Sequence, residues 1–351
     1  MPDRFLFLDG IRGLAAFTVV LGHAMYTIPE NGVDTFFVLS SFLLTLILYT
    51  KSLKLAEKGA GRNEWITMMI DYFIRRFLRV YPAFFVCAVM VSMLKYEDQQ
   101  KAWFLKGRDY KLWEVDSVNA DYYFFLQTAC LLDSSRITVL AKRWWYIPVT
   151  LCIIKSLYGD YRVLRDGQSF LHMHINTFLN GSSFAIIYVQ LKAMNIQKRI
   201  QESKYAEFVL DKMSCALGIW ILSLGYKRLF MQWVFEKGIT PGFPYSSIFL
   251  AILLTKECLI PGTVAKFFEW NFLVFAGKIS FSLYLTHSFV LYLWTHQEDP
   301  INFFWYLLFA SFSFAYLFYS LVEYPTTQFT NYISQWIKRK SSMYLPLNHK
   351  H

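Results

Sequence analysis

The sequence predicts an all-α protein, built as a polytopic transmembrane helix bundle of about ten helices. Composition gives the first reason: 55% of the 351 residues are hydrophobic and only 17% are charged, whereas soluble domains carry close to a quarter charged residues. The second reason is the recurrence of apolar runs near the roughly 20 residues that a helix needs to cross a bilayer. The third is the concentration of basic residues between those runs, which is typical of cytoplasmic loops.

Eight apolar stretches predict membrane-spanning helices, in chain order about 5–28, 33–50, 77–96, 170–191, 213–226, 243–260, 272–294 and 303–322. Two weaker stretches, 122–132 and 144–158, are shorter than a straight span requires. If both of them cross the membrane, the bundle has ten helices. If an internal deletion has shortened residues 120–158, it has nine. A short interfacial helix is also expected over Trp65–Phe73, ahead of the third span.

The formal net charge of +10 would suggest a nucleic-acid partner on a soluble protein. Here the basic residues lie between apolar runs: segment 51–79 holds seven basic and three acidic residues. The positive-inside bias places that segment and both termini in the cytoplasm, where basic side chains contact anionic membrane lipid. We therefore expect an integral multi-pass membrane protein with no nucleic-acid partner. It would comprise a transmembrane domain over residues 1–325 and a basic cytoplasmic tail over residues 326–351.

The first predicted helix carries three side chains that are costly inside a membrane: Asp9, Arg12 and His23. Arg12 and His23 are eleven positions apart, which puts them within about 20° of one face and about 16 Å apart along the axis. Asp9 lies three residues before Arg12 and can pair with it. An imidazole can act as a general base near neutral pH, and an arginine can hold an anionic group. The alternative is structural: an interfacial ion pair and a hydrogen-bonded histidine inside the bundle.

Three arginines precede the third predicted span: Arg75, Arg76 and Arg79. Arg76 and Arg79 are spaced i, i+3 and share a helix face at the cytoplasmic entrance. Two guanidinium groups there could bind the phosphates of a CoA-type nucleotide, because arginine matches phosphate geometry. The alternative is that the three residues only anchor the helix to anionic lipid.

Three further polar residues are candidates for the same site: Asp34, Ser40 and His287, of which His287 could line a cavity beside the first helix. Asp34 opens the second predicted helix, where it either complements the helix dipole or orients His23 or an acceptor hydroxyl. Ser40 is either a small packing residue or a hydrogen-bond partner, and His287 falls within the ninth predicted span. No metal is expected. Two other histidines, His172 and His174, are two residues apart and point to different sides of a helix.

Five segments, in this order, resemble the signatures of the acyltransferase 3 family of polytopic membrane acyltransferases. The resemblance covers nearly the whole chain and is carried by Leu8–Ala16 followed by Gly22-His23, Gly32–Ser40, Arg76–Pro82, Gly277–His287 and Glu323-Tyr324-Pro325.

The resemblance implies a ten-helix fold with both termini in the cytoplasm. It also implies transfer of an acyl group, usually acetyl, from cytoplasmic acyl-CoA to a hydroxyl acceptor such as a carbohydrate or a cell-envelope component. By the same resemblance, His23 is the catalytic imidazole, Arg12 is its partner in the acyl-transfer channel, and Arg76 and Arg79 contact the donor. Acyl-CoA is the implied co-substrate, with no metal.

The central region departs from the family pattern. Members generally carry a Trp-Ser/Thr-x-x-x-Glu segment in mid-chain, and the nearest trace is Trp145–Thr150, in which Thr150 stands in the place of Glu. The two short apolar stretches lie in the same region. A catalytically inactive or non-enzymatic polytopic protein, such as an exporter or a scaffold, is therefore the alternative to an acyltransferase.

Overall fold

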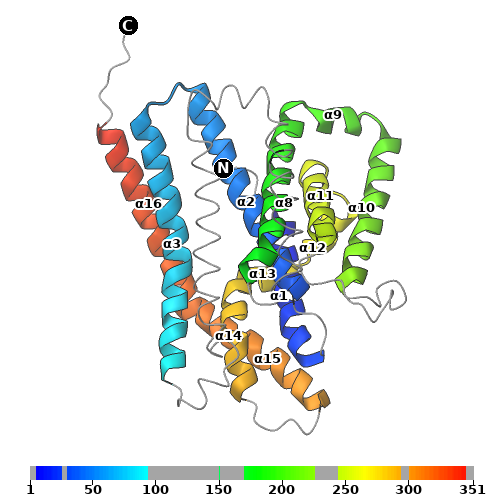
Figure 1. Ribbon diagram of the computed structural model, residues 1–351, viewed down its shortest axis with the longest axis vertical. Helices are drawn as coiled ribbons and strands as arrows, with labels where there is room; N and C mark the ends of the chain where they lie inside the picture. The colour runs from blue at the N-terminus through cyan, green and yellow to red at the C-terminus, as the bar shows by residue number, and fades with distance from the viewer. Residues whose placement is uncertain are drawn as a thin grey trace.

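The computed structural model describes residues 5–25, 30–93, 150, 170–225, 244–293 and 300–344. Every element in these ranges is a helix (Figure 1), so the all-α prediction is confirmed for them. The predicted span at 122–132 lies outside the described residues, and within the predicted span at 144–158 only residue 150 is described.

The first three helices are long: α1 Leu6–Met25, α2 Glu30–Glu57 and α3 Arg62–Ser92. The first two coincide with predicted spans. The expected interfacial helix and the third predicted span are instead one continuous 31-residue helix, α3, with Pro82 inside it. No glycine or proline separates Trp65–Phe73 from the apolar run that follows, so nothing in the sequence ends the helix there.

The remaining described helices run from α8 to α16. They are α8 Phe170–Ala193, α9 Ile196–Gln201, α10 Lys204–Gly225, α11 Pro244–Leu259, α12 Thr263–Phe268, α13 Asn271–Lys278, α14 Ser280–Leu293, α15 Pro300–Phe318, the π-helix η2 Tyr319–Glu323 and α16 Tyr324–Tyr344.

The predicted basic tail is mostly helical. Residues from Tyr324 continue from η2 as α16, which packs along α3 at one side of the molecule (Figure 1). At the predicted domain boundary, residue 325, the sequence therefore becomes more polar while the helical structure continues. The cytoplasmic location of 326–351 stays a prediction.

Two segments of the described residues are long and apolar enough to cross a membrane: Gly32–Glu57 and Asn302–Ile337. The ninth predicted span fails this test for a physical reason, because it breaks at Ile279 into α13 and α14, of 8 and 14 residues. The number of spans therefore stays a prediction. Large apolar side chains nevertheless remain on the outside, with Phe309 65% and Leu321 75% exposed. Lipid is a more favourable surrounding than water for such surface.

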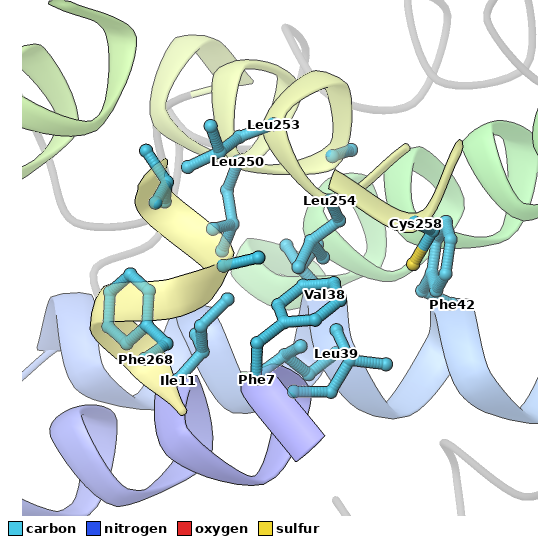
Figure 2. Packing of buried hydrophobic residues seen from close by; sticks show 14 of the residues in the cluster. Phe7, Ile11, Val38, Leu39, Phe42, Leu250, Leu253, Leu254, Cys258 and Phe268 are labelled. Atoms are coloured by element: carbon cyan, nitrogen blue, oxygen red, sulfur yellow. The ribbon is translucent and has the colours of Figure 1, made fainter. Parts of the chain in front are cut away.

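Helix α1 lies at the centre of the packing and contacts α2, α12, α13, α14 and α15. One cluster of buried side chains joins it to α2, α11 and α12, as Figure 2 shows for Phe7, Val38 and Leu254. A Cβ atom on Gly13 would lie 2.1 Å from the carbonyl oxygen of Leu273. Glycine is therefore required there for the α1 and α13 backbones to approach so closely.

Candidate functional site

Five side chains from four separate elements form a polar cluster beside α1. Glu323, the last residue of η2, is 5% exposed, and its Oε2 accepts a 2.6 Å hydrogen bond from the Ser282 hydroxyl of α14. Its carboxylate also interacts electrostatically with Arg12 of α1 and Arg79 of α3. Arg12 in turn interacts with Asp9, one turn earlier in the same helix. The cluster thus balances two positive charges with two negative ones.

This charge balance is what makes burial of Glu323 tolerable. An isolated carboxylate in an apolar interior is strongly disfavoured, whereas one that is paired and hydrogen-bonded is not. Arg12 is partly buried, and Arg79 is exposed at the edge of the cluster. The exposed Arg79 is therefore open to an anionic ligand, while Arg12 interacts electrostatically with Asp9 and Glu323.

Local backbone irregularities position the two partners from the C-terminal half. Glu323 ends a five-residue π-helix between α15 and α16, and such short π segments inside α-helices are frequent at functional sites. Ser282 lies in the first turn of α14, just after the break at Ile279. Both interruptions fall where the cluster forms.

His23 lies in α1, which is continuous from Leu6 to Met25. The helix therefore keeps His23 about 16 Å from Arg12 along its axis, as the spacing predicts. The side chain of His23 is outside the described residues. Its catalytic role and its shared passage with Arg12 stay predictions.

The structure separates Arg75 from the other two arginines of α3. Arg75 Nε donates a 3.0 Å hydrogen bond to Asp71 Oδ1, and its Nη2 also contacts the Ser334 hydroxyl of α16. Arg75 therefore ties α3 to α16. Arg76 interacts with Tyr72 and Arg79, and Arg79 reaches the Glu323 cluster. Neighbouring residues on a helix point about 100° apart, so Arg75 and Arg76 serve different faces.

Asp71 sits at the centre of the α3–α16 contact. Burial alone would raise the pKa of its carboxyl, but the hydrogen bonds from Ser334 and Arg75 and the charges of Arg75 and Lys51 hold that pKa below its ordinary value. Asp71 therefore stays ionised in the folded protein and stabilises the contact between the two helices.

The other predicted site residues fall in different places. Asp34 is 4% exposed in α2 and faces α8, where the Thr177 hydroxyl lies 3.5 Å from its Oδ1. Ser40 is exposed on α2. His287 is buried in α14, and its Nδ1 lies 2.7 Å from the Tyr284 carbonyl oxygen of the same helix. The structure thus brings Asp9, Arg12 and Arg79 together and leaves these three residues outside that cluster.

Glu323 and Ser282 were not among the predicted site residues. The sequence does hold a signal for Glu323, because it is the first acid after the apolar stretch 303–322, and an acid at the end of a span needs a partner. Ser282 gives no such signal, since small hydroxyl residues are common in apolar helices. Among the described residues, no group of three or more His, Cys, Asp or Glu side chains is arranged to hold a metal ion.

The chain is similar to one protein family and to several individual proteins. A family model described as an acyltransferase domain matches residues 5–323. A Staphylococcus aureus (strain COL) protein named "Putative O-acetyltransferase" is 25% identical over 362 residues, covering 91% of this chain and 56% of the relative. The peptidoglycan O-acetyltransferase OatA of Listeria monocytogenes is 37% identical over 87 residues, covering 24% of this chain and 12% of the relative. The chain thus spans about half the length of the Staphylococcus aureus relatives. No solved structure matches it.

Proposed function

The chain belongs to the acyltransferase family whose model matches residues 5–323, and from this membership we propose that it is an integral membrane O-acyltransferase. The donor is cytoplasmic acyl-CoA, with acetyl as the transferred group, and the acceptor is a hydroxyl group. The names of the Staphylococcus aureus and Listeria monocytogenes relatives support O-acetyl transfer. The Listeria name also supports a carbohydrate or cell-envelope acceptor.

The observation that carries the proposal is the cluster of Arg12, Arg79 and Glu323 around the helix that also bears His23. An exposed arginine beside a charge-balanced cluster suits a phosphate-bearing donor. We assign the phosphates of the donor to Arg79 and Arg76. Glu323 and Asp9 hold Arg12 in place along the path toward His23.

In the proposed reaction, the acceptor oxygen attacks the carbonyl carbon of the thioester, and the carbon–sulfur bond breaks. His23 takes the hydroxyl proton as general base and gives it to the departing thiolate, so CoA leaves as the thiol. Asp34, Ser40, Arg75 and His287 are not needed for this step. Any role for them in orienting acceptor or donor stays a prediction.

The test is acyl transfer from radiolabelled acetyl-CoA into endogenous acceptors in membranes that contain the full chain. His23→Ala is expected to lower transfer by about 10²- to 10⁴-fold, the usual contribution of a general base. His172→Ala, a histidine of α8 in a predicted span, is the matched control and is expected to retain transfer. If His23→Ala transfers as well as the unchanged protein, the catalytic role of His23 is wrong. If the correctly inserted protein transfers nothing to any acceptor, the inactive scaffold or exporter replaces the proposal.

A further inference from the structure

A cavity of about 320 Å³ opens between α1, α2, α10, α11 and α12. Figure 2 shows part of its wall, where Ile11, Leu250, Leu253 and Phe268 gather from three helices. Its volume falls in the range of small-molecule sites. Nothing in the proposed reaction uses it.

The cavity wall is chemically apolar. None of the residues that line it is charged. Two of its hydroxyl groups are already engaged: the Thr18 Oγ1 donates to the Ala15 carbonyl at 2.8 Å, and the Thr263 Oγ1 donates to Asp211 Oδ2 at 2.7 Å. Water in a cavity needs two to four polar partners, and a phosphate or sugar needs more. The wall therefore favours hydrocarbon.

The cavity opens through an apolar mouth. Ile219 and Leu222 of α10 and Phe267 of α12 line it and are 64%, 43% and 59% exposed, whereas Phe268 on its inner side is 8% exposed. In a membrane protein, an outer surface of this kind contacts lipid tails. The lining positions on α10 extend from Cys215 to Leu222, about 10 Å of helix rise.

The cavity and the charged cluster lie on different faces of α1. Four residues of α1 line the cavity, namely Ile11, Leu14, Ala15 and Thr18. At 100° per residue, the middle of their face is about a third of a turn from Arg12. A ligand in the cavity is therefore separated from the arginines by the body of α1. The two sites can be perturbed independently.

We propose that this cavity is a binding site for one hydrocarbon tail of a membrane phospholipid, which enters between α10 and α12. The site rests on the membrane location in the proposed function but not on acyl transfer. It explains why the α10 wall contains Gly218, where an added Cβ would meet no atom within 4 Å. That glycine leaves open the space that the tail occupies.

The experiment uses the full chain in phosphatidylcholine vesicles that contain a phosphatidylcholine with a photoactivatable diazirine in its tail. After illumination, labelled peptides are identified by mass spectrometry, with no acyl-CoA present. We expect labelling of the inner wall at Leu250, Leu253 and Phe268, which are 6%, 4% and 8% exposed and so are not reached by the surrounding lipid. This labelling should be lost in Gly218→Phe, because the ring fills the cavity. Ala216→Phe is the matched control. Ala216 is exposed on the same helix and does not line the cavity, so labelling should persist.

If Gly218→Phe does not insert into the membrane, Gly218→Leu takes its place, because leucine fills the cavity with a smaller side chain. Replacing a glycine inside a helix raises helix propensity, so lost labelling would not reflect a weakened α10. An unlabelled wall in the unchanged protein, equal labelling in Gly218→Phe, or equal loss in Ala216→Phe would each overturn the proposal. A parallel experiment with a diazirine-bearing fatty alcohol tests whether the bound hydrocarbon tail belongs to a phospholipid or to a single-chain lipid. Labelling of the wall by the alcohol alone would also overturn the phospholipid assignment.

Because the assay does not measure transfer, its failure leaves the proposed reaction untouched. Conversely, an inactive His23→Ala protein should still label at the cavity.

Discussion

Glu323→Gln is the sharpest perturbation of the charged cluster, because it keeps the shape of the side chain and removes its charge. The carboxylate accepts the Ser282 hydrogen bond and interacts electrostatically with Arg12 and Arg79. Gln can still accept from Ser282, so the loss is electrostatic. Removing one partner of a fully buried ion pair costs about 3–5 kcal/mol. Here Asp9 still compensates Arg12, and Arg79 is exposed and therefore screened by solvent. We expect the loss to be about 1–3 kcal/mol, in the range of a hydrogen bond to a charged group.

The assay is thermal unfolding of the purified protein in lipid nanodiscs, followed by tryptophan fluorescence. A double-mutant cycle with Arg12→Gln isolates the interaction between Arg12 and Glu323. Contacting charges give interaction free energies of about 0.5–3 kcal/mol in such cycles. We therefore expect Glu323→Gln to destabilise the Arg12→Gln protein less than it destabilises the unchanged protein. Additive effects of the two substitutions would refute the cluster, because they would show that the two charges do not interact.

Three further predictions concern the arginines of α3, Asp71 and Gly13. Arg79→Ala should raise the KM for acyl-CoA with little change in the unfolding temperature. Arg75→Ala should lower the unfolding temperature with little change in KM, because Arg75 binds Asp71 within α3 and joins α3 to Ser334 of α16. Steady-state kinetics and melting curves measure the two effects. Asp71→Asn should be less stable than the unchanged protein at pH 7. The folded-state pKa of Asp71 is lowered, so its contribution is complete above the unfolded value of about 3.9 and fades as pH falls through the folded value; a stability gap that widened in acid would contradict this. Gly13→Leu should prevent correct insertion or folding, because even a Cβ atom would meet the α13 backbone, and size-exclusion profiles in detergent would show it.

The sequence predicts the helices best where apolar residues run without interruption. α1, α2 and α8 coincide with predicted spans, because a long apolar run fixes a helix through local propensity and burial alone. The ninth stretch is equally apolar, yet it breaks at Ile279. That break lies where α13 packs against α1, and packing between distant segments cannot be deduced from the run itself.

The same distinction holds for the candidate site. Asp9 and Arg12 could be paired from their spacing, because both lie on one helix. The contribution of Glu323 could not be predicted in this way, because Glu323 lies 311 positions after Arg12 in the sequence. Arg75 looks equivalent to Arg76 and Arg79 in the sequence. Its pairing with Asp71 at i, i+4 follows from the spacing, but only the position of α16 brings it to Ser334.

The packing of helix α1 explains why the Leu8–Ala16 segment leaves so little freedom for substitution. At 100° per residue, three separate faces of this helix have incompatible requirements. One face needs Gly10 and Gly13, because the backbones of α12 and α13 touch it. The next carries Asp9 and Arg12 toward Glu323, and the third lines the apolar cavity. A larger residue on the first face, an uncharged one on the second or a polar one on the third would each disturb a different function of the helix. Between Asp9 and Thr18, α1 therefore has no face open to free substitution, whereas an ordinary membrane helix needs only to be apolar.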